Sequence, residues 1–351
     1  MFSPITARNV SACLTTICSA HRHTSGTPSY TNKLTFILLS GREKSVAEMI
    51  DSIKIEPLDF EPGTRYAYSN SGYFLLGAII EKVSGQPYAK FLQQRIFGPL
   101  GMTQSAYETP ATARATPVVG HTTKMWGGFG AASAISMSQV YAAGALVSTV
   151  DDMAKWDAAI SSGKLLKPAT WAQAFTPYNL SDGKCTSYGY GWQMAKVRGE
   201  REIGHGGDIN GFSAYTLRLP EKQVYVVLLT NADSDADRVR PVTVAKKAAA
   251  LAMGNPYPDF RPVALDARTL EVYAGDYKLN ERTSRTVRRD QDHLEVVRSG
   301  RPANAIYPLG GDRFFTKNSV TIFRFTRNTA GGIVQLILDD DGVEQAHTKV
   351  N

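Results

Sequence analysis

The chain has 351 residues, of which 43% are hydrophobic and 20% are charged, and its 39 basic and 32 acidic residues give a formal net charge of +7. This is the composition of a globular protein long enough for a sizeable core and two domains, which excludes a disordered or low-complexity chain. The basic excess is mild and forms no block, so no nucleic-acid partner is predicted, and no run approaches the ~20 apolar residues of a membrane span.

The first 22 residues show no clear periodicity and are predicted to be an irregular segment. They lack the basic, apolar and small-residue order of a signal peptide. The three cysteines, Cys13, Cys18 and Cys185, are too few for a disulfide framework. Cys18, His21 and His23 lie close together, but no second ligand pair follows at zinc-like spacing, so no metal site is predicted.

The stretch Phe60–Tyr107 combines a polar-aromatic segment with a predicted helix. The expected buried face of this helix consists of apolar residues at helical spacing: Phe74, Leu75, Ala78, Ile79 and Val83. Ser84-Gly85 is expected to end it, and Pro87 to begin the next helix. Tyr68 and Asn70 directly precede the helix, where a rigid support can present a phenol and a carboxamide to a ligand.

The middle of the chain contains a predicted helix start and a predicted hairpin. A helical piece is also expected earlier, over residues 45–53, and Thr149 is expected to cap a later helix. A strand is expected to begin at Tyr188. Strands at 213–219 and 224–230 are expected to form a hairpin across Pro220–Gln223, with a helix near 240–253 covering the sheet.

The composition changes after a linker at residues 256–264. Short alternating strands then follow one another, separated by turn residues, at 273–277, 294–297, 313–315, 321–325 and 334–338. That spacing is typical of a small antiparallel barrel or sandwich over residues 265–351.

Several phrases of the sequence resemble one family, the serine β-lactamase-like, penicillin-binding-protein-like hydrolases. Its members include class C β-lactamases, D-alanyl-D-alanine carboxypeptidases and related esterases. The Y-x-N motif of that family matches Tyr68-Ser69-Asn70, its H-x-G motif matches His205-Gly206-Gly207, and further phrases match at residues 23–26 and 144–156. The resemblance implies an α+β β-lactamase/transpeptidase-like domain over residues 23–255, followed by a lipocalin-like β domain.

The resemblance also implies roles for individual residues. Tyr68 would be a general base or proton relay, provided that a neighbouring cation lowers the pKa of its phenol from about 10. His205 would supply a cation or an N–H donor. The residues expected to bind the substrate are Asn70, Gly206, Gly207 and Asp208. No cofactor and no metal are expected, and the partner is a small-molecule or peptide substrate.

The first family motif, S-x-x-K, is absent from its expected place, since the 22 residues before His23 contain no lysine. Two other matches exist, Ser161–Lys164 and Ser181–Lys184, but both contain a glycine that would loosen the Ser–Lys geometry. A β-lactamase-like domain that is incomplete at its N-terminus is therefore expected, as a truncated or degraded copy of an active relative.

Two functions are left open. The first is a serine hydrolase that cleaves an ester or amide through an acyl-enzyme, with weak or absent activity because the nucleophile is missing. The second is a non-catalytic binding protein for a peptide or peptidoglycan-like ligand. Oligomeric state and compartment are not predicted, although members of the family are often periplasmic or secreted.

Overall fold

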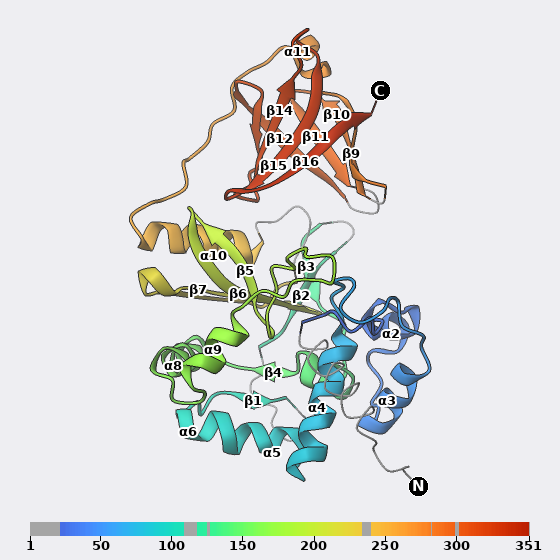
Figure 1. Ribbon diagram of the computed structural model, residues 1–351, viewed down its shortest axis with the longest axis vertical. Helices are drawn as coiled ribbons and strands as arrows, with labels where there is room; N and C mark the ends of the chain where they lie inside the picture. Colours follow the sequence, from blue (N-terminus) through green and yellow to red (C-terminus); the bar gives the residue numbers. More distant parts are fainter. Residues whose placement is uncertain are drawn as a thin grey trace. The chain divides into compact units, whose positions relative to one another are not determined.

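The computed structural model describes residues 22–108, 118–124, 127–233, 240–281, 283–298 and 302–350. The predictions for Cys13, Cys18, His21 and the first 21 residues lie outside these described residues. The chain divides into two compact units (Figure 1). The first unit contains Met1–Met194, Ile203–Ser213 and Leu229–Asp233, and the second contains Ala195–Glu202, Ala214–Leu228 and Ser234–Asn351.

The first unit is mainly helical, with short paired strands. Its helices and turns are η1 (Tyr30–Asn32), α2 (Leu34–Leu39), α3 (Val46–Lys54), α4 (Asn70–Ser84), α5 (Tyr88–Leu92), the π-turn η2 (Gln93–Phe97), α6 (Gly98–Leu100), α7 (Met137–Val140), η3 (Tyr141–Ala143), α8 (Val150–Ser162) and α9 (Pro168–Ala174). Strand β1 (Ala106–Tyr107) pairs with β4 (Leu146–Val147), and β2 (His121–Thr123) pairs with β3 (Phe129–Ala131).

The central helix of this unit is α4, and its sequence fixes both ends. The Oγ of Ser69 accepts a hydrogen bond from the N–H of Gly72, and Gly85 ends the helix in the left-handed region at φ 67°. Phe74 is fully buried, as expected, but Val83 is 82% exposed, so its predicted place in the buried face was wrong. The buried face runs instead through Ser71, Gly72, Phe74, Leu76 and Gly77, in the N-terminal half of the helix.

Helix α8 begins at the predicted cap, where the side chain of Thr149 accepts from the N–H of Asp152. Asp152 is buried rather than solvated, because the N–H of Gln104 and the hydroxyl of Ser105 both donate to its carboxylate. Lys155 pairs with the same carboxylate at 2.8 Å. These hydrogen bonds hold the start of α8 against Gln104 and Ser105, in the segment after α6.

An antiparallel sheet follows, in the order β5 (Gln193–Val197), β6 (Glu200–Ile209), β7 (Phe212–Leu219) and β8 (Val224–Thr230). The predicted hairpin is present, with the turn η4 at Pro220–Lys222, but the first strand begins at Gln193 rather than at Tyr188. Helix α10 (Pro241–Ala252) lies where a helix was predicted, and Ala245, Ala249 and Ala250 pack against Leu217 and Leu219.

The C-terminal strands close into an eight-stranded antiparallel barrel with neighbours in chain order, as expected for a small barrel (Figure 1). Its strands are β9 (Gly275–Asn280), β10 (Thr283–Asp290), β11 (His293–Arg298), β12 (Ala303–Gly310), β13 (Arg313–Phe315), β14 (Ile322–Arg327), β15 (Ile333–Asp340) and β16 (Val343–Val350). Leu270, from the short helix α11 (Ala267–Glu271), is buried in the barrel core.

The sequence did not predict β10, β12 and β16. Strands β10 and β16 are polar along most of their length, and only Val287 and His347 are fully buried on them. A barrel strand with one solvated face needs few apolar residues, so its periodicity is weak. Among the described residues, none of the helices has both the length and the apolar character that crossing a bilayer requires.

We expect a large difference between two leucines of the barrel. Leu294 is fully buried in the barrel core, whereas Leu279 is 39% exposed. Leu294→Ala should lower the stability of the barrel by about 2–5 kcal/mol, because it opens a cavity, and Leu279→Ala should cost much less. Amide hydrogen exchange of β9–β16 in urea measures both values. Equal losses would contradict the assignment of the core.

Candidate active site

Six aromatic rings from distant parts of the chain lie together in the first unit. This ring cluster consists of His23, Tyr66, Tyr68, Tyr73, Tyr188 and His205. The ring centroids of Tyr68 and His205 are 6.2 Å apart, and those of Tyr68 and His23 are 4.0 Å apart. The two motif residues singled out in the sequence, 137 positions apart, are therefore neighbours in space.

The local structure explains how the rings are held. Tyr68 directly precedes Ser69, the N-cap of α4, and Tyr73 lies in the first turn of that helix. His205 lies on β6, and Tyr188 forms an isolated bridge to Gln193 at the start of β5. The cluster is thus built between the N-terminus of a capped helix and the strands of the sheet.

The hydroxyl of Tyr188 lies between two imidazoles. It is 3.1 Å from Nε2 of His23 and 2.9 Å from Nε2 of His205. The other nitrogens of both rings face backbone groups: Nδ1 of His23 accepts from the N–H of Ser69 at 3.0 Å, and Nδ1 of His205 is 2.5 Å from the carbonyl oxygen of Gly206. These four contacts join α4 to β6 through side chains.

The two backbone groups assign a tautomer to each ring. Because Nδ1 of His23 accepts a hydrogen bond, the neutral ring carries its proton on Nε2 and donates to the oxygen of Tyr188. Because Nδ1 of His205 faces a carbonyl, that nitrogen carries the proton, and its Nε2 accepts from the hydroxyl of Tyr188. The hydrogen bonds therefore run in one direction, from the N–H of Ser69 to the carbonyl of Gly206.

Tyr73 completes the surroundings of this hydroxyl. Its side chain is also hydrogen-bonded to Tyr188. A phenolic oxygen has one proton and two lone pairs. With the proton directed to His205, both lone pairs are available to the N–H of His23 and the hydroxyl of Tyr73, so Tyr188 reaches its full hydrogen-bonding capacity.

Both histidines are neutral near pH 7. Burial, with a smaller contribution from His205, lowers the pKa of His23 to about 3. Burial likewise lowers the pKa of His205. This differs from the expected role of His205, because a neutral ring with both nitrogens engaged supplies neither a cation nor an unoccupied N–H.

Tyr68 also differs from its expected role. The side chain is 43% exposed, and burial of the remainder raises the pKa of its phenol. The expected role of Tyr68 depends on a nearby cation that lowers this pKa, and none of the described residues has that effect. At neutral pH the phenol of Tyr68 is therefore protonated.

The predicted substrate-binding residues fall into two places. Asn70 is the first residue of α4, and its amide Nδ2 donates to Thr31 Oγ1 at 2.9 Å. Gly206, Gly207 and Asp208 follow His205 on β6. A Cβ added at Gly207 would meet open space within 4 Å, while the carboxylate of Asp208 accepts from the hydroxyl of Ser213.

The second half of β6, which begins at His205, extends beyond its neighbour β5. Strand β5 has five residues and β6 has ten, and the turn between them joins Val197 to Glu200. Strand β5 can therefore pair with only the first half of β6, and His205 begins the second half. Strand β6 is an inner strand of the sheet, between β5 and β7, and its second half extends beyond β5.

Four members of the ring cluster were not predicted from the sequence: His23, Tyr66, Tyr73 and Tyr188. In the sequence, His23 stands out in the phrase at residues 23–26 and beside Cys18 and His21, and Tyr188 only as an expected strand start. Three tyrosines, Tyr66, Tyr68 and Tyr73, lie within eight positions, and Tyr188 lies more than a hundred positions later. Nothing in this spacing indicates that the four side chains meet in the folded chain. The described residues contain no group of three or more His, Cys, Asp or Glu that could hold a metal ion.

A helical region beside an antiparallel sheet, with the Y-x-N tyrosine and the H-x-G histidine brought to one cluster, is the arrangement of the serine β-lactamase-like class. Residues 15–250 match the family described as Beta-lactamase, and the chain belongs to that family.

Individual relatives agree with this assignment. The chain is 25% identical over 353 residues to penicillin-binding protein 4* of Bacillus subtilis, covering 92% of this chain and 76% of that protein. It is 28% identical to a D-aminopeptidase of Gluconobacter oxydans, but spans only 43% of that protein's length. An octameric penicillin-binding protein homologue from Pyrococcus abyssi shares the fold over 94% of this chain and 76% of its own, with a TM-score of 0.61 and 23% identity.

We expect the first unit to lose stability as the pH falls from about 6.5 towards 3. The pKa of His23 is about 3 in the folded chain, and an ordinary histidine titrates near 6.5, so the unfolded state binds the extra proton in this window. His23 alone should contribute a slope of up to about 1.4 kcal/mol for each pH unit. His23→Gln should flatten the slope.

The fluorescence of Trp156, Trp171 and Trp192 during urea unfolding follows the first unit, to which all three belong. Comparison of wild type and His23→Gln from pH 4 to pH 7 gives the difference in slope. An unchanged slope would show that His23 is not buried in its neutral form.

The tautomers are a separate expected outcome. Imidazole ¹⁵N spectra at pH 7 should show His23 protonated at Nε2 and His205 protonated at Nδ1. Tyr188→Phe removes the donor to His205 Nε2 and should shift that nitrogen, while Tyr178→Phe is the matched control because Tyr178 belongs to the same unit but not to the ring cluster. A His205 ring protonated at Nε2 in the wild type would contradict the directed hydrogen bonds.

Proposed function

We propose that the ring cluster and the second half of β6 form the ligand-binding part of an acyl-transfer site for amides or peptides that contain a D-amino acid. We propose further that this 351-residue polypeptide hydrolyses such substrates weakly or not at all. The observation that supports the site most directly is the approach of Tyr68 and His205 to a ring-centroid distance of 6.2 Å.

The first S-x-x-K sequence does not have the geometry of an activated serine. A one-turn spacing brings serine and lysine together only on a continuous helix. Ser161 lies near the end of α8, and Gly163 ends that helix at φ 68°. Lys164 therefore lies beyond the helix, and its Nζ donates to the carbonyl of Pro99 at 2.8 Å.

The second S-x-x-K sequence lies in a loop. Gly183 has φ 83°, and the Nζ of Lys184 pairs with the carboxylate of Asp182 at 2.7 Å. Both lysine and aspartate are well exposed. This lysine is paired with a carboxylate next to it in sequence, which leaves it poorly suited to take a proton from Ser181.

The serines next to Tyr68 in sequence have structural partners. Ser69 caps α4. The hydroxyl of Ser71 donates to the carbonyl of Pro28 at 2.6 Å and accepts from the N–H of Tyr30 at 2.9 Å. These contacts hold the loop before α4 in place, and neither hydroxyl is directed towards a base.

The groups that remain are suited to binding. Tyr68 is partly exposed and protonated at neutral pH, so its phenol can donate to a carbonyl or carboxylate oxygen of a ligand. Asn70 lies two residues away, and the space beside Gly207 lets an extended ligand approach the backbone of β6. An edge-strand segment binds an extended peptide through its backbone groups.

The relatives support the substrate class. One similar protein is named a D-aminopeptidase and another a penicillin-binding protein. The H-x-G sequence in place of K-T-G favours peptidase or esterase chemistry over efficient β-lactam hydrolysis. A peptide ending in D-alanine is therefore the first ligand to test.

A second candidate function is a binding protein without catalysis. It is favoured by the neutral state of both histidines and by the raised pKa of Tyr68, because donors without a base recognise a ligand but do not activate an alcohol. The two functions share the same ligand and differ in whether a covalent adduct forms.

Covalent labelling and binding measurements distinguish the hydrolase from the binding protein. We expect no adduct from a fluorophosphonate or a fluorescent β-lactam with the 351-residue chain, and reversible binding of an N-acetylated D-alanyl-D-alanine peptide by calorimetry. Tyr68→Phe should weaken that binding about three- to tenfold, as expected for one lost hydrogen bond. Tyr307→Phe, in the barrel, is the matched control and should bind like the wild type.

Each outcome decides a part of the proposal. A stoichiometric adduct on a serine would show an active nucleophile in this chain and overturn the expected inactivity. Absence of both adduct and binding, or binding that Tyr68→Phe leaves unchanged, would overturn the ligand-binding role of the ring cluster.

A further inference from the structure

A row of basic side chains crosses the inner face of the barrel in the second unit. Strands β16, β9, β10 and β11 are neighbours there (Figure 1). Arg285 on β10 pairs with Arg298 on β11 and with Tyr277 on β9, and Tyr277 pairs with Lys349 on β16. Residues paired across antiparallel strands share one face of the sheet.

The buried neighbours identify that face as the interior. Tyr277 is fully buried, Val287 lies two positions after Arg285, and Val296 lies two positions before Arg298. All three belong to the core of the barrel. Since side chains alternate along a strand, Arg285 and Arg298 emerge on the inner side.

Two arginines directly opposite each other on one face repel, which destabilises a strand pair. Such a pair is normally offset by a carboxylate. The groups that act on Arg285 are its own burial and Arg298, and both lower the pKa of its guanidinium. No carboxylate of the described residues forms an ion pair with either arginine, so the local charge is uncompensated within the described chain.

The only described side chain hydrogen-bonded to Arg285 is His347, which is fully buried on β16. The Nε–H of Arg285 donates to Nε2 of His347 at 3.2 Å, and Nδ1 of His347 faces the carbonyl of Gln345. The ring is therefore neutral. Burial, with Arg285 and Arg298 nearby, lowers the pKa of this imidazole, so it adds no positive charge and fixes the orientation of the guanidinium.

This arrangement leaves the outer N–H groups of the guanidinium unused. Arginine has five N–H donors, and in the described part of the chain only the Nε–H of Arg285 has an acceptor. Arg298 is exposed and has no hydrogen-bond or ion-pair partner among the described residues. Two guanidinium groups, one of them oriented, can together surround an oxyanion.

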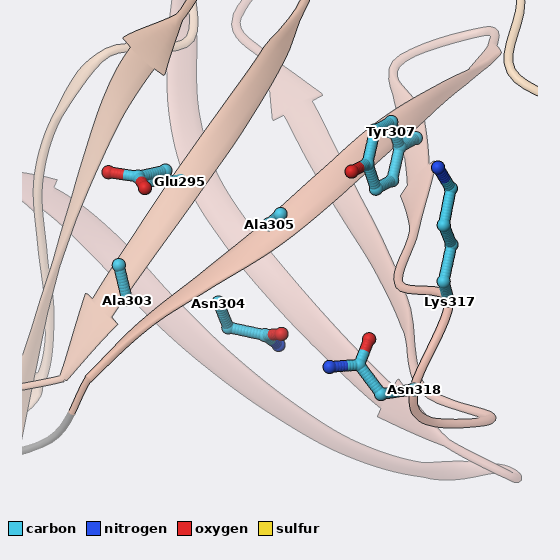
Figure 2. A pocket seen from close by; sticks show the side chains of 7 residues that line it. All are labelled: Glu295, Ala303, Asn304, Ala305, Tyr307, Lys317 and Asn318. Atoms are coloured by element: carbon cyan, nitrogen blue, oxygen red, sulfur yellow. The ribbon is translucent and has the colours of Figure 1, made fainter. Parts of the chain in front are cut away.

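The outer face of the same strands shows the contrast. Arg288, three positions after Arg285, pairs with Glu295 at 2.7 Å. Glu295 also lines a hollow of about 290 Å³ together with Tyr307 and Lys317 (Figure 2). The ammonium of Lys317 lies 4.0 Å from the ring centroid of Tyr307. In that hollow each charged group has a partner, whereas neither Arg285 nor Arg298 forms an ion pair with a carboxylate of the described residues.

We infer that Arg285 and Arg298 form a binding site for the oxyanion group of a small molecule, a carboxylate or a phosphate, inside the end of the barrel. The ends of small β-barrels are common places for ligands, and an anion would offset the repulsion between the two cations. This site lies wholly in the second unit and is independent of the ring cluster and of the function proposed for it.

Titration of the full chain with inorganic phosphate tests the site directly. The Nε–H signals of Arg285 and Arg298 in ¹H–¹⁵N spectra should shift saturably, while that of Arg288 should not. Acetate, at matched ionic strength, reports whether a carboxylate binds as well, and chloride is the control for screening. Equal shifts with chloride, or no saturable shift with phosphate and acetate, would overturn the inference.

Matched variants locate the effect. Arg298→Gln should weaken phosphate binding about tenfold or more, as expected for the loss of charge-assisted hydrogen bonds, and Arg285→Gln should do the same. Arg288→Gln, on the outer face of β10, should bind phosphate like the wild type.

Stability without the anion gives a second measurement. Because Arg298 is exposed and unpaired among described residues, Arg298→Gln should leave the barrel as stable as the wild type, or more stable, in phosphate-free buffer. Phosphate should then raise the melting temperature of the wild type more than that of the variant. If phosphate stabilises both proteins equally, the site does not involve Arg298 and the inference fails.

Discussion

The hydroxyl of Tyr188, held between the imidazoles of His23 and His205, is the interaction on which the candidate site depends. It connects the loop before α4 to strand β6 through hydrogen bonds of 3.1 and 2.9 Å. The backbone N–H of Ser69 and the carbonyl of Gly206 fix the two ends, so each ring has one tautomer.

The same hydrogen bonds limit the acid–base chemistry that the two histidines can perform. A buried neutral imidazole that accepts from a phenol is held in place, but it neither carries charge nor offers a proton to a ligand. Tyr68, with a raised pKa, adds a second donor and no base. These properties support the proposal that the described cluster recognises a ligand. An acyl-transfer reaction would require an activated alcohol, and neither S-x-x-K sequence in the described chain has the helical geometry to supply one.

The barrel combines an apolar core with basic side chains on its inner face. Its core is apolar and closed, with Leu294, Ile306 and Leu336 fully buried, and yet Arg285, Arg298 and His347 share its inner face. Like charges on one face oppose folding unless something offsets them. The apolar core accounts for the stability of the barrel, and the basic row marks the part of its interior where an anion would be most favourable.

Local sequence determined much of the architecture. The cap at Thr149, the helix stop at Gly85 and the hairpin after Leu219 follow from short-range hydrogen bonding and backbone preference, so they could be predicted from the sequence. The motifs around Tyr68 and His205, which resemble those of the family, can also be read from the sequence. Strands β10 and β16 could not be recognised, because one solvated face and a few inward residues leave little periodicity.

Tertiary structure alone decided which side chains meet and in what state. His23, Tyr188 and His205 are separated by 165 and 17 positions, and no local pattern relates them. Burial, which depends on the packing of the whole unit, keeps both histidines neutral and raises the pKa of Tyr68. The sequence thus determined the residue types available to the site, while long-range packing set their partners, protons and charge, because desolvation and hydrogen-bond direction exist only once distant segments come together.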